Sequence, residues 1–110
     1  MKLLNAERAI VDIEKLRGYC LNPNHPRGRH KARIFQSALG LTTDDADELR
    51  DALLAAARTY DVALAEKDEY GQRFVLDFIM SKHDKQATVR SSWIVRRGED
   101  SPRLTSCYVL

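Results

Sequence analysis

The fold is decided by the stretch Arg73-Phe74-Val75-Leu76-Asp77-Phe78-Ile79-Met80, in which the side chains alternate in character from one residue to the next. The even-numbered positions are all large and apolar, whereas two of the odd-numbered positions carry charges. A period of two residues is typical of a β-strand with one buried face and one more polar face. We therefore expect this stretch to be a strand of an antiparallel sheet.

Other stretches before and after it also have strand character, and polar, glycine-containing segments typical of hairpin turns separate them. The predicted strands are Val62 to Ala65, residues 73–80, Thr88 to Arg96, and Leu104 to Val109. Within the third strand, Val89, Ser91, Trp93 and Val95 are expected to share one face. Small hydroxyl residues should interrupt the apolar pattern of the opposite face and leave it open; they are Ser91, Ser92, Thr105 and Ser106.

Helical patterns precede the strands. A short helix is expected after Asp12, ending near Gly18, and a second from about Arg29 to a stop at Gly40. A third follows Thr42-Thr43-Asp44-Asp45, with a buried stripe formed by Ala46, Leu49, Leu53, Ala56 and Tyr60. Helices followed by hairpin-connected strands predict an α+β fold. We expect residues 1–110 to form a single domain, with N-terminal helices packed on one face of a roughly four-stranded antiparallel sheet.

The composition fits a soluble globular protein, with 44% hydrophobic and 31% charged residues among 110. The net charge of +2 is too small to imply nucleic-acid binding by itself. Its distribution is more informative, because residues 15–33 hold six cations and no acid, whereas residues 44–51 hold five acids and one arginine. These blocks predict a basic patch and an acidic helix face.

No stretch is apolar enough to cross a membrane, and the N-terminus lacks the apolar core of a signal peptide. Cys20 and Cys107 match no zinc or redox spacing, so reduced thiols in a cytoplasmic protein are the expectation. Cys20, His25 and His30 are spaced more loosely than the usual zinc ligands. We expect no metal, no cofactor and no membrane association.

One run concentrates the groups that bind anions and transfer protons, Asn22-Pro23-Asn24-His25-Pro26-Arg27-Gly28-Arg29-His30-Lys31-Ala32-Arg33. It lies at the predicted start of a helix, where free N–H groups favour an anion and Gly28 would permit a close backbone approach. The candidate phosphate ligands are Arg27, Arg29, Lys31 and Arg33. The alternative is a solvated cationic face.

The histidines are candidates for proton transfer near neutral pH. His25 lies in a loop restrained by two prolines, and two roles are open for it, as a proton carrier or as a structural hydrogen-bonding residue that fixes the loop. His30 is interpreted as a surface residue, and His83 as an exposed residue of a polar turn.

A second candidate group lies on the strands and consists of Arg90, Ser92, Thr105 and Tyr108. Adjacent antiparallel strands would bring Ser92 and Thr105 together if the register permits. The alternative is ordinary polarity on a strand surface. Trp93 is expected in the core, and Asp77 is expected to pair with a neighbouring arginine.

The basic run, continued by Ile34-Phe35 and then Leu39-Gly40-Leu41, resembles a small bacterial family of domains of unknown function with the pattern N-P-x-H-P-x-G-x-x-K-A-R-x-F. The second half of the chain fits the family as well, through Tyr70-Gly71, residues 89–94 and residues 98–108. The family is similar to toxin modules of the group of barnase-, EndoU-, colicin- and RelE-like ribonucleases. This chain has Ser92 and Ser106 where the family favours threonine, and each keeps a hydroxyl.

The resemblance implies helices packed on a four-stranded antiparallel sheet and a catalytic set of His25, Lys31, Ser92, Thr105 and Tyr108. Arg27, Arg29, Arg33 and Arg90 would bind phosphate. The leading hypothesis is a toxin-like, metal-independent endoribonuclease that acts on RNA and has a cognate antitoxin or small companion protein. The alternatives are a non-catalytic module that binds RNA, phosphate or a partner, and a structural accessory domain. The oligomeric state stays open.

Overall fold

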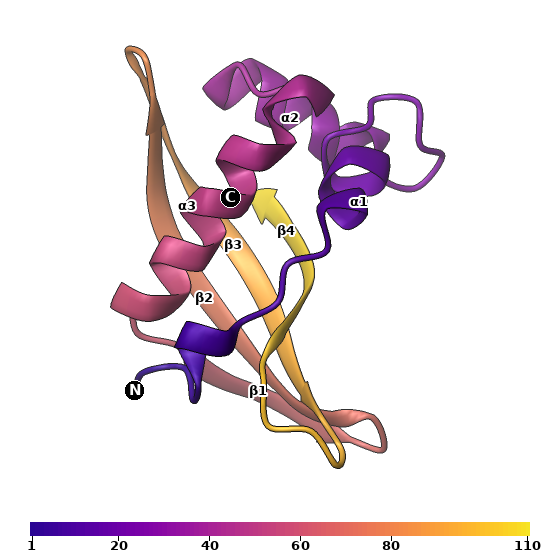
Figure 1. Cartoon of the computed structure of the whole chain (residues 1–110). Helices are drawn as coiled ribbons and strands as arrows, with labels where there is room; N and C mark the ends of the chain where they lie inside the picture. The colour runs from indigo at the N-terminus through magenta and orange to yellow at the C-terminus, as the bar shows by residue number, and fades with distance from the viewer.

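A computed structural model describes all residues, 1–110, and has the predicted α+β fold (Figure 1). Three helices precede a four-stranded antiparallel sheet whose strands follow the chain in the order β1-β2-β3-β4. The helices are α1 (Ile13–Lys15), α2 (Arg29–Leu39) and α3 (Ala46–Thr59), and the strands are β1 (Ala63–Asp68), β2 (Gly71–Lys82), β3 (Lys85–Arg96) and β4 (Arg103–Val109).

The alternation predicted for β2 is confirmed, because its even-numbered side chains from Phe74 to Met80 are buried toward the helices. They pair across the ladder with β3 residues of the same face, among them Trp93 opposite Phe74. Ser91 shares the helix face with Val89 and Trp93, as expected, so the other expectation, that it lies on the open face, is wrong: this serine is fully buried. Its hydroxyl donates to the carbonyl of Leu76 and accepts the indole N–H of Trp93, so a polar residue fits there without unpaired groups.

Helix α2 begins at Arg29 and ends before Gly40, whose φ of 69° provides the left-handed stop that was predicted. Thr42 and Asp45 form a reciprocal capping box that leads through a single 3₁₀ turn into α3. The apolar stripe of α3 is buried from Ala46 to Ala56, but Tyr60 lies beyond the helix end and is partly exposed.

The helical part of the N-terminal segment is longer than expected. Asp12 accepts the Glu14 N–H as the cap of α1, as predicted, but the helical path continues through a π turn to Cys20 instead of ending near Gly18. This extension buries Leu16 and Cys20 against the rest of the core. A parallel bridge between Ile10 and Arg103 attaches the preceding extended segment to β4.

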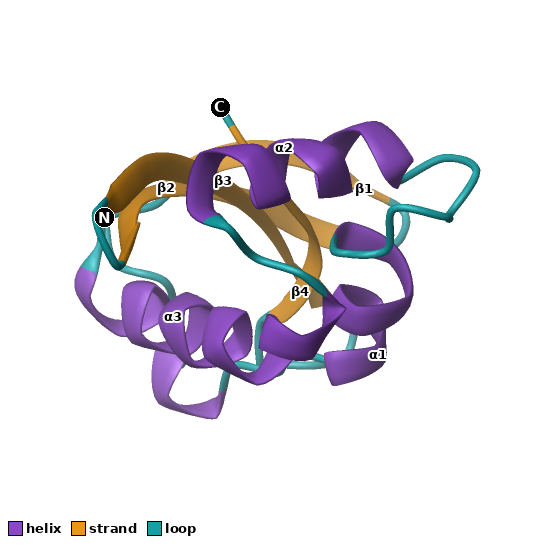
Figure 2. Cartoon of the chain, turned by 90° about the horizontal axis from the view of Figure 1, so that it is seen from above, coloured by secondary structure: helices purple, strands orange, loops and turns teal.

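The helices gather on one side of a curved sheet, so the other face of the sheet is left uncovered (Figures 1 and 2). The β2–β3 hairpin runs beyond the start of β1, whose ladder with β2 covers only residues 71–75 of that strand. None of the helices combines the length and the hydropathy required to cross a bilayer.

Candidate functional site

The open face of the sheet carries a row of polar side chains formed by strand register. Arg90 lies opposite Asp77 on one side and Tyr108 on the other. Its guanidinium makes two hydrogen bonds to the Asp77 carboxylate, at 2.8 and 2.9 Å, which confirms the expected pairing of that acid. This pair raises the pKa of Arg90, to which the neighbouring Tyr108 also contributes, and it lowers the pKa of Asp77. Arg90 is thus a fixed cation directly across the ladder from a phenol.

Helix α2 brings a second cation to the same tyrosine. The Lys31 ammonium lies 4.7 Å from the centre of the Tyr108 ring, in the geometry of a cation–π contact. We call Lys31, Arg90 and Tyr108 the cation–tyrosine cluster. It joins the basic run of the first half of the chain to the last strand, two segments whose proximity the sequence alone could not establish.

Next to this cluster, β4 carries one extra residue. Ser92 lies opposite Ser106, and Trp93 lies opposite Leu104, so Thr105 is the inserted residue of a β-bulge. The Thr105 hydroxyl donates to the carbonyl of Ser92 at 3.1 Å. We call Ser92, Thr105 and Ser106 the hydroxyl bulge. Ser92 is two residues from Arg90 on the same face, which places the bulge about 7 Å from the cluster along the strand.

The bulge lies at the meeting point of three cavities on this part of the surface, all of which Thr105 lines. One of about 180 Å³ lies between the hydroxyl bulge and Arg73. A larger one of about 520 Å³ is lined by Tyr70, Arg73, Ile94, Arg96 and Thr105. We call this larger cavity the arginine groove. The open face therefore has recesses lined by cations and hydroxyls, which is the chemistry that holds phosphate esters.

His25 fixes the loop that precedes α2. Its Nδ1 accepts the backbone N–H groups of Arg27 and Gly28, at 3.0 and 3.1 Å, and its ring meets Tyr19 edge-on at 4.6 Å. An acceptor nitrogen carries no proton, so a neutral ring bonded in this way holds its proton on Nε2. This geometry agrees with the structural role considered for His25. Because Nδ1 is occupied by these hydrogen bonds, only Nε2 could carry a proton in catalysis.

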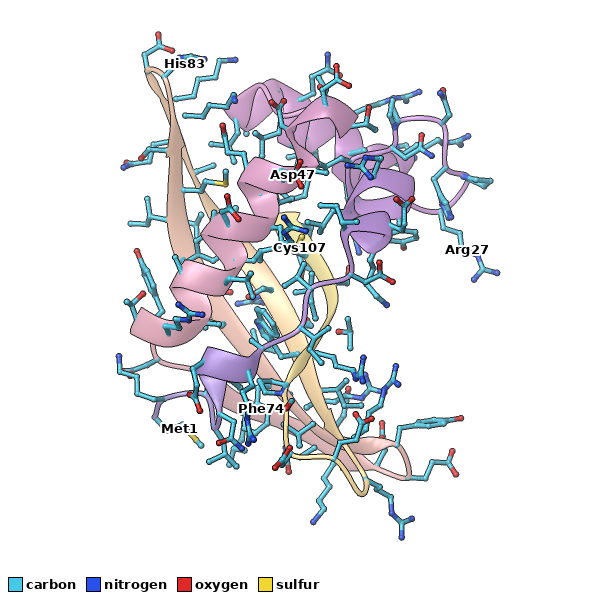
Figure 3. The ribbon with its side chains drawn as sticks, viewed as in Figure 1. Met1, Arg27, Asp47, Phe74, His83 and Cys107 are labelled. Carbon is cyan, nitrogen blue, oxygen red and sulfur yellow. The ribbon has the colours of Figure 1, made fainter.

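The other members of the basic run face solvent. Arg27, Arg29 and Arg33 are exposed and form no ion pair, and Arg27 extends away from the body of the molecule (Figure 3). Gly28 does permit a close approach, but the approaching group is the carbonyl oxygen of Tyr19, which a Cβ at this position would meet at 2.8 Å.

Cys20 and Cys107 lie together in the interior beneath the candidate site, both as free thiols. A hydrogen bond from the Cys107 thiol lowers the pKa of Cys20 to about 7, against the opposing effect of burial. The same hydrogen bond and burial raise the pKa of Cys107. Figure 3 shows Cys107 in the interior, in contrast to His83, which lies at the tip of the β2–β3 hairpin as an exposed turn residue.

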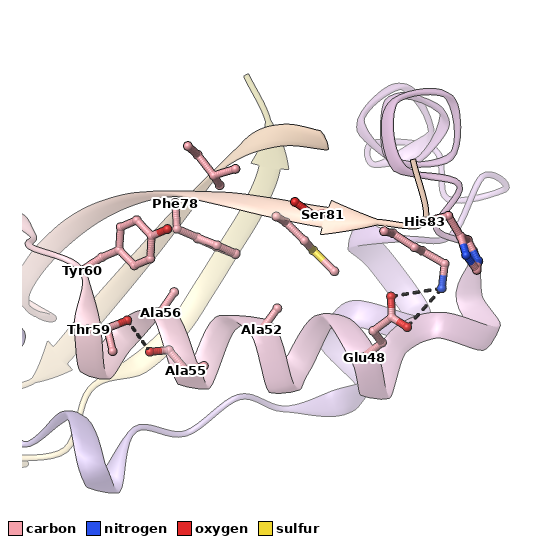
Figure 4. Close-up of a pocket in the computed structure, with 12 residues that line it drawn as sticks. Glu48, Ala52, Ala55, Ala56, Thr59, Tyr60, Phe78, Ser81 and His83 are labelled. Carbon is pink, nitrogen blue, oxygen red and sulfur yellow. Dashed lines mark hydrogen bonds and ion pairs between the residues drawn. The ribbon is translucent and has the colours of Figure 1, made fainter. Parts of the chain in front are cut away.

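A separate groove of about 520 Å³ lies between α3 and β2 (Figure 4). Small side chains of α3, such as Ala52 and Ala55, form one wall, and Phe78 and Met80 contribute to the other. At one end, the Lys82 ammonium pairs with Glu48 at 3.0 Å. This groove is mainly apolar and contains none of the residues predicted for the site.

Sequence reasoning missed the contribution of Tyr70, Arg73 and Arg96 to the open face. Arg73 and Arg96 occur in strands with alternating patterns, and counting outward-facing cations along β2 and β3 would have found them. Tyr70 belongs to the turn between β1 and β2. An aromatic side chain in a polar turn has no position in the core, and this could have marked Tyr70 as a candidate for the open face.

Comparison with known proteins identifies a family and a solved structure of similar fold. Residues 2–110 match the family described as Domain of unknown function (DUF6883). No curated protein matches the chain. A solved structure titled "Contact-dependent growth inhibition toxin - immunity protein complex from Klebsiella pneumoniae 342" has a similar fold, with a TM-score of 0.70 and 14% identity over 92% of this chain and 99% of that chain.

Proposed function

The chain belongs to the family Domain of unknown function (DUF6883), and we propose that it is a toxin-like, metal-independent endoribonuclease whose site is the cation–tyrosine cluster with the hydroxyl bulge. The observation that carries this proposal is the Lys31 ammonium 4.7 Å from the Tyr108 ring, beside the Arg90 guanidinium. Two cations and a phenol at one point of an open face match the needs of phosphodiester cleavage, which develops negative charge on phosphate oxygens.

The proposed reaction is a transesterification within RNA. The ribose 2′-hydroxyl loses its proton to solvent water and its oxygen attacks the adjacent phosphorus. The bond from phosphorus to the 5′ oxygen breaks, that oxygen takes the proton of the Tyr108 hydroxyl, and the Tyr108 phenolate regains a proton from solvent. The products are a 2′,3′-cyclic phosphate and a 5′-hydroxyl. Lys31 and Arg90 stabilise the charge on the phosphoryl oxygens, and the Tyr108 hydroxyl is the group between them that can pass a proton.

The remaining residues have supporting roles in this proposal. The hydroxyls of Ser92 and Thr105 orient the phosphate, and Arg27, Arg29 and Arg33 attract the RNA backbone from solvent. His25 positions the start of α2, and thereby Lys31, through its two backbone hydrogen bonds. RNA as the substrate would place the activity in the cytoplasm.

A companion protein is the second part of the proposal. The structural neighbour is a complex of a toxin and an immunity protein, which supports a chain that works with a partner. The feature of this chain that favours a partner is the edge of β2 beyond Val75, where β1 no longer pairs with it. Ile79 on this edge is 54% exposed, and the apolar groove against α3 runs alongside. An uncovered apolar strand edge is a site for pairing with another chain. Partner binding without catalysis is therefore the second candidate function.

The test is RNA cleavage by the purified protein in the presence of a chelator. Lys31→Ala removes the ammonium, and Tyr108→Phe removes only the hydroxyl, because the ring and its contact with Lys31 stay. We expect each variant to lower kcat by roughly 10²- to 10³-fold, the range for removal of a charge-stabilising or proton-transferring group.

Matched controls separate the site from a general loss of charge or fold. Lys67→Ala removes an exposed cation of β1 outside the cluster, and Tyr60→Phe removes a phenol hydroxyl at the α3–β2 groove. Both should cleave RNA like the unmodified protein. Cleavage by Lys31→Ala at the rate of the unmodified protein would contradict the assignment of the site. If none of the proteins cleaves RNA, the ribonuclease proposal is rejected and partner binding remains as the candidate function.

A further inference from the structure

The arginine groove lies at the opposite end of the open face from the cation–tyrosine cluster. Arg90 and Arg96 are six residues apart on β3, which corresponds to about 20 Å along the strand. The hydroxyl bulge lies between them, because Thr105 lines the arginine groove and also donates to Ser92. Cluster, bulge and groove therefore form one continuous track across the sheet, long enough for several nucleotides.

Tyr70 gives this groove an exposed aromatic face on a rigid support. Its side chain is 63% exposed, yet its backbone is fixed on both sides. Its N–H donates to Asp68 at 2.9 Å, and its carbonyl accepts the Arg97 N–H at 3.0 Å. The following residue, Gly71, has a φ of 150° and packs so closely on β3 that a Cβ would lie 2.2 Å from the Val95 carbonyl oxygen. The turn is thus held in place before any ligand binds, which lowers the cost of binding.

The two arginines of the groove differ in whether a carboxylate neutralises their charge. Arg73 is held by Asp68 at 3.0 Å, whereas Arg96 forms no ion pair with any carboxylate of the chain. Ile94 contributes an apolar surface between them. An aromatic ring, an apolar floor and an unbalanced guanidinium together match an unpaired base attached to a phosphate.

We propose that the arginine groove binds one unstacked nucleotide of a single-stranded nucleic acid, with the base against Tyr70 and its phosphate on Arg96. This inference rests on the proposed function, because it gives the RNA a second contact about 20 Å from the cleavage site. Duplex RNA keeps its bases stacked inside the helix and offers none to Tyr70. The track therefore selects single-stranded over duplex substrates.

The experiment measures binding separately from cleavage. A fluorescent single-stranded oligodeoxynucleotide of eight residues lacks the 2′-hydroxyl, so its anisotropy reports affinity with no reaction. We expect Tyr70→Ala to weaken binding roughly 5- to 150-fold, the effect of removing one aromatic stacking contact. Tyr70→Phe should bind like the unmodified protein. For a duplex of the same length, Tyr70→Ala should change nothing.

A charge-matched pair tests the phosphate contact. Arg96→Gln should weaken binding and make the dependence of log affinity on log salt shallower by about 0.7, the value for one phosphate of a single strand. Arg97→Gln removes a charge at the neighbouring position, outside the groove, and should leave the slope of log affinity against log salt unchanged. Unaltered affinity of Tyr70→Ala for the single strand would overturn the inference even if RNA is cleaved. Tyr70-dependent binding without any RNA cleavage would support it while removing the proposed catalysis.

Discussion

At the residue scale, His25 shows how one side chain can order a loop that the backbone cannot order alone. The Pro-flanked loop exposes the first N–H groups before α2, and imidazole Nδ1 accepts two of them. Asn and Asp side chains commonly accept backbone N–H groups in the same way at turns and helix starts. The imidazole adds an edge-on contact with Tyr19, which ties the loop to the N-terminal segment.

This geometry gives opposite expectations for two substitutions of His25. Asn keeps an oxygen that accepts the Arg27 and Gly28 N–H groups, whereas Ala leaves both without a partner. We expect His25→Ala to lower the free energy of unfolding by about 1 kcal/mol and His25→Asn to lower it less. Urea denaturation of the two variants measures the difference.

RNA cleavage by the same variants separates the two roles of His25. A positioning residue can be replaced by Asn with little loss of kcat, and we expect this outcome. A proton carrier cannot be replaced by Asn, whose amide does not titrate. Loss of cleavage in a stably folded His25→Asn protein would therefore return His25 to the catalytic set.

Individual residues also show which features of the site could be predicted from the sequence and which could not. The candidate hydroxyls and cations could be selected from the sequence by residue type, because charge and strand alternation are visible there. Their grouping was not, since Lys31 meets Tyr108 only through the packing of α2 on β4. The sequence left Ser91 assigned both to the face of Trp93 and to the open face, and the register of β2 and β3, which buries it beside Trp93 and Leu76, decides between them.

At the scale of elements, the approach to α3 depends on the capping box between Thr42 and Asp45. The Thr42 N–H donates to the Asp45 carboxylate at 2.9 Å, and Lys82 approaches the same carboxylate at 3.4 Å from the end of β2. The hydrogen bond from Thr42 is the main reason why the pKa of Asp45 lies below its usual value of 3.8. The charged carboxylate is thus favoured by the fold.

The sign of the resulting pH dependence follows from the lowered pKa. The stabilisation by Asp45 is complete above the ordinary pKa of 3.8 and is lost as the pH falls through the lower value of the folded state. Asp45→Ala should therefore lower the free energy of unfolding by about 1 kcal/mol near pH 7, and the difference from the unmodified protein should shrink below pH 3.8. Urea denaturation across this pH range measures it.

Asp44→Ala is the matched control, because Asp44 is an exposed acid of the same turn that forms no ion pair. Its loss should matter less at every pH. A difference between Asp45→Ala and the unmodified protein that grows in acid would refute the assigned role.

The strands were predicted well where side chains alternate and too short where pairing extends them. Lys85 to Ala87 lacks a β pattern, yet it is strand because it pairs with residues 80–82 across the tight turn of the hairpin. The end of β1 at Lys67 and Asp68 is strand for the same reason, since both residues pair with the start of β2. Tertiary pairing overrides local propensity in both cases.

At the scale of the whole molecule, an open meander with helices on one face leaves the other face free for binding. Its polar track is assembled from α2, β3, β4 and the β1–β2 turn, and the bulge at Thr105 lies in the middle of it. The layer arrangement was predictable, because the helical and strand periods occupy separate halves of the chain. The bulge was not, since the adjacent hydroxyl residues Thr105 and Ser106 do not by themselves distinguish a bulge from ordinary polarity on a strand surface.

In the function proposed above, the open face cleaves RNA through the ribose 2′-hydroxyl. An oligodeoxynucleotide with a single internal ribonucleotide, incubated with the protein in a chelator, tests this most directly. We expect one cut, directly 3′ of the ribonucleotide, with a 2′,3′-cyclic phosphate on one product and a 5′-hydroxyl on the other. An intact chimeric strand at high protein concentration, or an equal rate of cutting in an all-DNA strand, would contradict it.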